Sequence, residues 1–195
     1  GSPFKTLQAL AALQEGVIST ETTFRCYNGF YVGRTKRGCH CGGGVRTMND
    51  GIYKSCNAYF AGTFRKFYES FQTTDDAMDV WEKHMKSFGL GDYLGYDLPS
   101  GQKGLIPDSK LYDRYYPNHR WKAITTISNA IGQGEVLTTP IQLANMTAAI
   151  ANRGFYYTPH ILKKVGDSTI QDKNFTSPKF TTINPRHFEP VIDGM

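Results

Sequence analysis

Three stretches of the chain carry apolar side chains at the spacing of an amphipathic helix. The first runs from Pro3 to Glu15, where Ser2 is the expected N-cap and Gly16 the expected stop. The second follows residue 57, and the third runs from a Thr74 cap to Phe88. The spaced apolar positions are Phe4, Leu7, Leu10, Ala11 and Leu13; Tyr59, Phe60, Phe64, Phe67 and Phe71; and Ala77, Val80, Trp81, Met85 and Phe88. One face of each helix is therefore expected to be buried.

A fourth helix is predicted from its start signal. Thr139-Pro140-Ile141-Gln142 combines a capping box with proline at the first helical position, and this helix should end near Gly154. A short helix capped by Asn49 or Asp50 is expected to lead into residue 55.

Fewer residues favour strands. Residues 17–24 are rich in β-branched and aromatic side chains, so a short extended segment is expected there. Residues 27–44 are dense in glycine and indicate a long loop, and residues 89–120 contain many turn formers and indicate little regular structure. Residues 166–195 are expected to form turns, short strands and the start of another element near Phe188.

Composition narrows the possible partners. The 195 residues include 22 Lys and Arg against 17 Asp and Glu, and the net charge of +5 is spread without a dense basic run. Such an excess suits a protein near anionic cell-surface polymers or membranes, and no nucleic-acid partner is expected. There is no apolar run of 18 residues and no leader, and the chain begins inside a motif, so we interpret it as a fragment.

The first candidate for chemistry is the pair Ser2 and Lys5. Their three-residue spacing at a helix start places both side chains on one face. A lysine with a lowered pKa can accept the proton of a serine hydroxyl and make it a nucleophile. Ser-x-x-Lys is the first signature of penicillin-binding proteins. Two alternatives remain at this point: Gly1-Ser2 is a remnant of an expression vector, or Ser2 only caps the helix.

A second pair lies 53 residues further on. Ser55-Cys56-Asn57 has the Ser-x-Asn form, in which a second hydroxyl could relay a proton to a leaving amine. The amide of Asn57 could orient a substrate carbonyl or the lysine.

All four cysteines lie between residues 26 and 56. Cys26, Cys39, Cys41 and Cys56, with His40 as an alternative, offer more than the four ligands that tetrahedral zinc needs. If residues 39–41 are extended, Cys39 and Cys41 face the same way and His40 faces the opposite way, which favours the four cysteines. The pattern alone leaves zinc, disulfides and free thiols open.

Several blocks in order resemble one family. The blocks are residues 1–6 and 13–16, Lys54-Ser55-Cys56-Asn57-Ala58-Tyr59-Phe60, Gly95-Tyr96-Asp97-Leu98-Pro99, Ile131-Gly132-Gln133-Gly134 and Thr139-Pro140-Ile141-Gln142. Together they resemble the transpeptidase domain of class B penicillin-binding proteins, and most of all the elongation-type penicillin-binding protein 2. The ordered combination favours a native Gly1-Ser2 over a vector remnant.

The resemblance implies an α+β fold, of which residues 1–195 would be the largely helical part with few strands, within a serine β-lactamase/transpeptidase-like domain. It implies a serine D,D-transpeptidase that cross-links peptidoglycan stem peptides and is trapped by β-lactams. Ser2 would be the nucleophile and Lys5 its base, while Ser55 and Asn57 would serve the leaving group and substrate orientation. No cofactor would take part in the catalysis.

The third signature, Lys-Thr-Gly, is absent: the only Lys-Thr pair is Lys5-Thr6, which Leu7 follows. In the family that motif lies on a later strand and helps to form the oxyanion hole, so we expect the fragment alone to be catalytically impaired. The resemblance further implies an extracytoplasmic location on the periplasmic side, an inner-membrane anchor outside these residues, and cell-wall elongation proteins as partners.

Relatives of penicillin-binding protein 2 that carry a structural zinc use the middle residue of Ser-x-Asn as one ligand. Cys56 occupies that position here, which makes zinc the leading hypothesis for residues 26–56. Two other function classes compete with the transpeptidase: a penicillin-sensing receptor domain, and a zinc-stabilised binding module without chemistry.

Overall fold

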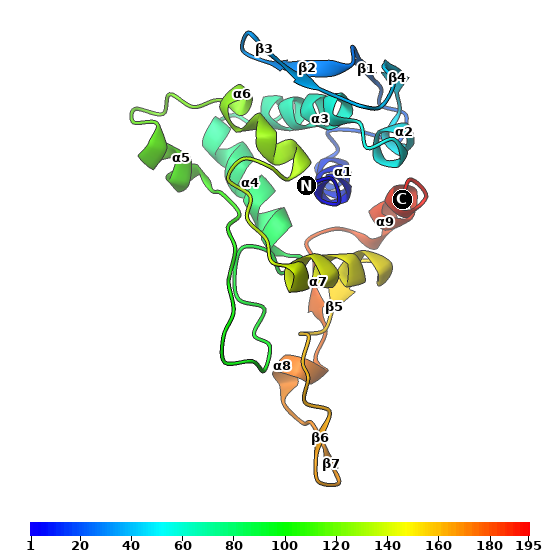
Figure 1. Cartoon of the computed structure of the whole chain (residues 1–195), viewed down its shortest axis with the longest axis vertical. Helices are drawn as coiled ribbons and strands as arrows, with labels where there is room; N and C mark the ends of the chain where they lie inside the picture. The colour runs from blue at the N-terminus through cyan, green and yellow to red at the C-terminus, as the bar shows by residue number, and fades with distance from the viewer.

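Helix α1 (Phe4–Gln14) lies in the middle of the larger part of the computed structural model, which describes residues 1–195 (Figure 1). All of its residues from Phe4 to Leu13 are buried, including the polar Lys5 and Gln8. The sequence predicted only one buried face. The helix is instead enclosed on all sides because α3 (Asn57–Glu69), α4 (Thr74–Lys86), α9 (Phe188–Ile192) and the short helix η1 (Ile127–Ile131) surround it.

Aromatic rings from three helices form the centre of the core. The ring of Trp81 lies 5.8 Å from the rings of both Phe4 and Phe64, edge-on to the second. Its indole N–H donates to Oε1 of the buried Gln8 at 2.7 Å. The three predicted amphipathic helices are thus confirmed, and they share one core.

Two small antiparallel sheets lie over the outer side of α3 (Figure 1). Strand β1 (Phe24–Cys26) pairs with β4 (Gly44–Arg46), and β2 (Gly29–Val32) pairs with β3 (Thr35–Gly38). The prediction of a long loop over residues 27–44 was therefore wrong, because these residues contain the hairpin β2–β3, which lies between the paired strands β1 and β4. The extended segment expected from residue 17 begins only at Phe24.

The remaining helices differ from prediction mainly at their starts. Helix α7 (Pro140–Ala151) has the predicted capping box at Thr139. Helix α2 (Met48–Tyr53) is capped by Thr47, and α4 is capped by Thr73, each one or more residues before the predicted cap. One helix in the turn-rich region of residues 89–120 was not predicted: α5 (Ser109–Tyr115), which Asp108 caps. The single-turn α6 (Ala123–Thr126), just after that region, was not predicted either.

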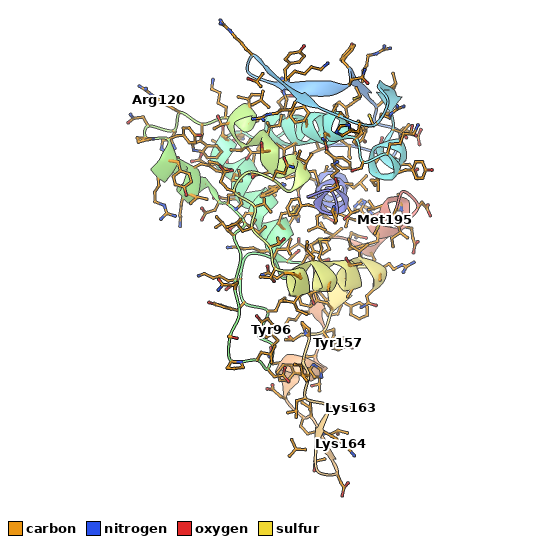
Figure 2. The ribbon with its side chains drawn as sticks, viewed as in Figure 1. Tyr96, Arg120, Tyr157, Lys163, Lys164 and Met195 are labelled. Atoms are coloured by element: carbon orange, nitrogen blue, oxygen red, sulfur yellow. The ribbon has the colours of Figure 1, made fainter.

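Residues 157–178 form a narrow arm that extends away from the larger part (Figures 1 and 2). At its base β5 (Phe155–Tyr156) pairs with β8 (Lys179–Phe180), and beyond it β6 (Lys164–Val165) pairs with β7 (Ser168–Thr169). The arm also contains the one-turn helix α8 (Lys173–Thr176), and the chain then returns through η2 (Pro185–His187) to α9, the element predicted near Phe188. None of the helices combines the length and the hydropathy needed to cross a bilayer.

Candidate active site

Ser2 does not cap α1. Pro3 takes the N-cap position with a helical backbone, and no side chain accepts a hydrogen bond from the first turn. The early N–H groups are instead satisfied by backbone oxygens, since Phe4 donates to Gly1 and Lys5 donates to Ser2, both at 3.0 Å. The Ser2 hydroxyl is therefore available to other side chains.

Lys5 is the centre of a small polar cluster. Its Nζ lies 3.3 Å from Oγ of Ser2, 2.8 Å from Oγ of Ser55 and 2.7 Å from the backbone oxygen of Ser55. The side chain is almost completely buried. Burial lowers the pKa of Lys5 below its ordinary value of 10.5, against the opposing effect of the negative charge that Cys39, Cys56 and Cys41 can carry. A buried amine with a lowered pKa can act as a base.

Ser55 joins the two predicted motifs. Its Oγ lies 2.9 Å from Oγ of Ser2, so the serine and lysine side chains form a closed triangle of contacts. The turn that presents Ser55 has left-handed backbone geometry at this residue, with φ +50°. Helix α2 ends just before the turn, where it packs so closely on α3 that a Cβ on Gly51 would lie 2.8 Å from the Tyr59 ring.

Asn57 is the first residue of α3, and it connects the turn to the hairpin β2–β3. Its Nδ2 donates to the backbone oxygen of Gly38 at 3.1 Å, and its backbone N–H donates to Sγ of Cys39 at 3.1 Å. The structure thus places all four predicted site residues in one continuous region. Their catalytic roles stay predictions.

A polar cavity of about 310 Å³ opens beside Asn57. Gln133 also contributes to it, and the preceding Gly132 packs against the start of α1, where a Cβ would lie 2.5 Å from Cβ of Phe4. Gly132 has φ +65°, so both its space and its backbone require glycine. The lining residues are Phe30, Arg37, Gly38, Asn57, Ser128, Ile131 and Gln133. Sequence reasoning missed Arg37 and Gln133 as site residues, although the glycines on each side of Gln133 mark a tight turn.

The four cysteines meet directly behind the Ser55 turn. Their Sγ atoms all lie within 4.8 Å of one another, all four side chains are buried, and none is in a disulfide. Sγ of Cys56 lies 3.0 Å from Cys41 and 3.6 Å from Cys39. His40 is exposed and lies outside the cluster, as expected for an extended segment in which Cys39 and Cys41 face the same way.

The cysteine cluster has the dimensions of a tetrahedral metal site. Four sulfurs at a zinc–sulfur distance of about 2.3 Å would lie roughly 3.8 Å apart, which falls inside the observed range. The backbone N–H groups of Asn57 and Tyr59 already donate to sulfurs of the cluster, as metal-bound thiolates require. Burial opposes ionisation of Cys41, but hydrogen bonds from Cys56, Cys26, Cys39 and Arg46 lower its pKa to about 6. The donor set therefore fits zinc.

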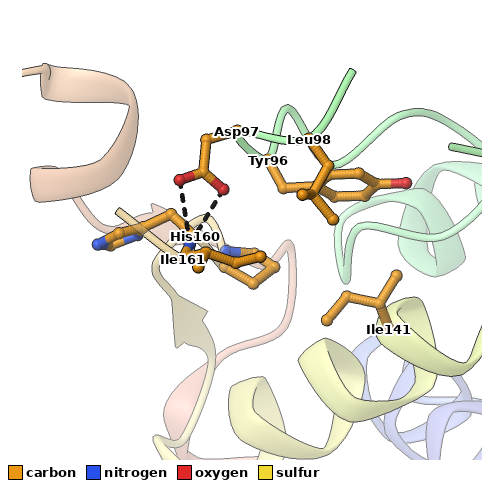
Figure 3. A pocket seen from close by; sticks show the side chains of 7 residues that line it. Tyr96, Asp97, Leu98, Ile141, His160 and Ile161 are labelled. Atoms are coloured by element: carbon orange, nitrogen blue, oxygen red, sulfur yellow. Dashed lines mark hydrogen bonds between the residues drawn. The ribbon is translucent and has the colours of Figure 1, made fainter. Parts of the chain in front are cut away.

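A second pocket, of about 280 Å³, lies where the arm meets residues 96–98 (Figure 3). It is mainly apolar, and Asp97 closes one side by accepting hydrogen bonds from the backbone N–H groups of Ile161 and Leu162 at 2.7–3.0 Å. None of the four predicted catalytic residues lines it. Its carboxylate is committed to the backbone of the arm, so we assign the pocket no chemistry.

Comparisons with known proteins point to one family. The family model described as "Penicillin binding protein transpeptidase domain" matches residues 1–195. Among curated proteins, the chain is 32% identical over 167 residues to the peptidoglycan D,D-transpeptidase MrdA of Acinetobacter baumannii, covering 84% of the chain and 23% of the relative. It is 30% identical over 201 residues to MrdA of Haemophilus influenzae, covering 100% of the chain and 29% of the relative. The chain thus spans less than a third of these relatives.

Solved structures share the fold over the whole chain. A penicillin-binding protein 2 structure from Pseudomonas aeruginosa, in complex with WCK 5153, gives a TM-score of 0.82 at 27% identity and covers 100% of this chain and 42% of that one. The penicillin-binding protein 2 of Helicobacter pylori gives 0.78 at 26% identity, with 100% of this chain and 34% of that one covered. The α+β fold expected from the sequence is confirmed.

Proposed function

The chain belongs to the penicillin-binding protein transpeptidase family, and from that membership we propose that the protein is a peptidoglycan D,D-transpeptidase that acts through an acyl-enzyme on Ser2. The observation that carries the proposal is the triangle of Ser2, Lys5 and Ser55, whose contacts are 2.8–3.3 Å. In this triangle the Ser2 hydroxyl lies beside a buried amine, which supports its role as the nucleophile.

In the first step Ser2 Oγ attacks the carbonyl between the two terminal D-alanines of a stem peptide. A neutral Lys5 amine has two N–H groups and one lone pair. One N–H can donate to the backbone oxygen of Ser55, 2.7 Å away, which leaves the lone pair free to accept the Ser2 proton. The buried position favours the neutral amine because a charge there loses hydration.

Ser55 then serves the leaving group. Its Oγ contacts both Lys5 Nζ and Ser2 Oγ, so it can pass the proton from Lys5 to the departing D-alanine amine. A second stem-peptide amine would resolve the acyl-enzyme by the reverse route. The side-chain amide of Asn57 is fixed by its hydrogen bond to the backbone oxygen of Gly38, and it would orient the bound peptide. A β-lactam would acylate Ser2 by the first step alone.

Labelling of the full-length protein with a fluorescent penicillin tests the nucleophile. We expect covalent labelling that Ser2→Ala abolishes, while the exposed Ser19→Ala, in the segment that follows α1, leaves it unchanged. Labelling that survives Ser2→Ala would overturn the proposal. Turnover of a D-Ala-D-Ala peptide distinguishes the transpeptidase from a penicillin-sensing receptor, which would keep the acyl group.

Replacement of Lys5 tests the base. We expect Lys5→Met to lower the acylation rate by roughly 10²–10⁴-fold, the usual contribution of a positioned proton acceptor. Lys164→Met on the arm is the matched control. The acylation rate of the unmodified protein should rise with pH as Lys5 loses its proton, at a pH below 10.5 because burial lowers its pKa. A rate independent of pH up to 10.5 would contradict this assignment.

We also propose that residues 1–195 by themselves are catalytically impaired. They contain no Lys-Thr-Gly motif. A hydrogen-bond donor to the oxyanion would therefore be missing, at a cost of about 3 kcal/mol in the transition state. We expect the isolated chain to be acylated roughly 10²–10³-fold more slowly than the full-length protein. Equal rates would contradict this.

We also propose that Cys26, Cys39, Cys41 and Cys56 hold a structural zinc ion. The support is the mutual approach of four buried sulfurs. When bound, zinc would supply mechanical fixation of the turn between residues 54 and 57, not a step of the reaction. Metal analysis of the purified protein should find one zinc per chain, and Cys41→Ser should lose it while His40→Ala keeps it. A metal-free preparation with two disulfides would overturn the assignment.

Location and partners are proposed from the relatives. One solved structure is a complex of penicillin-binding protein 2 with MreC from Helicobacter pylori, and another is titled a peptidoglycan synthase complex. We propose that the full-length protein works on the periplasmic side, anchored in the inner membrane, with cell-wall elongation proteins. Membrane fractionation with affinity capture of the full-length protein tests this, and recovery in the cytoplasm would overturn it.

A further inference from the structure

The polar cavity beside Asn57 contains one charged side chain. Of its seven lining residues only Arg37 carries a charge. Arg37 forms no ion pair, and its guanidinium makes no hydrogen bond with the rest of the protein. The cation is therefore available to a ligand in the cavity.

The backbone at Arg37 is held in place from two sides. Across the hairpin, a Cβ on Gly29 would lie 2.3 Å from the backbone oxygen of Arg37, so only glycine permits this approach. Along the chain, the next residue, Gly38, accepts the hydrogen bond of Asn57. The position of Arg37 relative to the Ser-x-Asn turn is thus fixed by the fold, not by a mobile loop.

Two residues that line the cavity connect it to the surroundings of Ser2. Asn57 is two residues from Ser55, whose hydroxyl contacts Ser2, and Gln133 follows Gly132, which packs against the start of α1. A peptide acylated on Ser2 and held by Asn57, as proposed above, would extend the residues that precede its scissile bond toward this cavity.

We propose that Arg37 determines substrate specificity by binding a side-chain carboxylate of the donor stem peptide, at a residue that precedes the terminal D-alanines. The planar guanidinium presents paired N–H donors that match a carboxylate. The polar neighbours Asn57, Ser128 and Gln133 suit a charged, hydrated group better than an apolar one. This inference rests on the proposed function and names the substrate feature that the site recognises.

Two penicillins test it on the full-length protein. Benzylpenicillin and its analogue with a carboxylate on the benzylic carbon acylate the same serine, and their side chains occupy the place of the preceding peptide residue. We expect Arg37→Gln to lower the second-order acylation rate of the carboxylated penicillin about tenfold and that of benzylpenicillin less than twofold. Arg37→Lys should recover part of the loss. Arg34→Gln, on the turn of the same hairpin and outside the cavity, should change neither rate.

The outcomes separate this proposal from the proposed function. Equal changes for the two penicillins, or no change for either, in a folded Arg37→Gln protein would overturn the role of Arg37 alone. Failure of both penicillins to acylate the unmodified protein would overturn the proposed function and this inference with it. Because the Arg37 side chain is exposed, both variants should fold, and an unchanged thermal midpoint checks this.

Discussion

Two short hairpins of this protein are alike in local structure and unlike in their attachment. The site hairpin, β2–β3, and the arm hairpin, β6–β7, are both antiparallel and turned by a glycine with φ +58°, Gly33 in one and Gly166 in the other. The site hairpin continues into Cys39 of the sulfur cluster and receives the hydrogen bond of Asn57. All four paired residues of the arm hairpin are exposed.

The difference shows that the turn residues suffice to form a hairpin, whereas tertiary contacts decide whether the hairpin is held beside the site. An isolated two-stranded hairpin is marginally stable in water. Attachment through the cysteines and Asn57 holds the site hairpin in one position beside the nucleophile, where it can present Arg37. We expect the two hairpins to respond differently to matched substitutions.

Loss of the sulfur attachment should have the largest effect. If the cluster holds the proposed zinc, Cys39→Ser, or removal of the ion with a chelator, is expected to lower the free energy of unfolding by on the order of 3–5 kcal/mol, because the buried sulfurs would lose the ion that joins them. Val165→Ser on the arm hairpin should change it by less than about 0.5 kcal/mol. Urea denaturation of the metal-loaded and chelated proteins measures both. An unchanged midpoint after chelation would contradict the expectation.

Disturbing the close approach of the strands in the site hairpin should cause the next largest loss of stability. Gly29→Ala is expected to cost about 2–3 kcal/mol, since its Cβ would lie 2.3 Å from a backbone oxygen that cannot move without shifting Arg37. Acylation should slow as well. Gly38→Ala, in the paired strand, has nothing within 4 Å of its Cβ and is the control for the stability measurement. Similar losses for the two variants would show that packing at Gly29 is not the cause.

The turn glycines of the two hairpins form a matched pair for substitution. Gly33 and Gly166 have the same φ, and a Cβ at either position would have nothing within 4 Å, so each alanine substitution meets only backbone strain of about 1 kcal/mol. We expect Gly33→Ala to lower the free energy of unfolding by that amount. Gly166→Ala should lower it less, because the arm hairpin can open without unfolding the core. Hydrogen exchange of the two hairpins would show this difference, and equal global losses would argue against local opening.

The last effect concerns the response of the core to acid, which acts outside both hairpins. His84 is buried, with its ring nitrogens at 2.6 Å from Thr182 and 2.9 Å from Glu15. Burial lowers the pKa of His84 below 6.5, although Glu15 opposes this. The unfolded chain then binds more protons than the folded one below pH 6.5, so stability should fall as the pH drops through 6.5, by at most about 1.4 kcal/mol per pH unit. His84→Gln should reduce this slope, and an identical slope would contradict it.

The sequence predicted those parts of the fold whose signals are local. The capping box at Thr139 and the apolar spacing of α3 and α4 depend on residues within one or two turns, and both were confirmed. The alternation of Cys39, His40 and Cys41 likewise anticipated which side chains turn inward.

The features that could not be predicted from the sequence depend on contacts between residues far apart in the chain. Pro3, by taking a helical backbone itself, removed the expected cap from Ser2, and Ser55 from 53 positions away contacts the hydroxyl instead. The site hairpin was missed because dense glycine resembles a loop until its cysteine and Asn57 contacts are known. No sequence pattern marks Arg37 as a site residue, because only the packing of the hairpin on α3 brings it to the cavity.

If it holds the proposed zinc, the sulfur cluster would impose an order of events on the maturation of the protein. Each sulfur can enter either a metal bond or a disulfide, and four thiols this close offer six possible pairs for oxidation. A single disulfide would remove two of the four ligands and so prevent tetrahedral coordination of an ion. In an oxidising compartment, metal uptake and thiol oxidation would therefore compete, and the fraction of active protein would depend on whether the ion arrives before the oxidant.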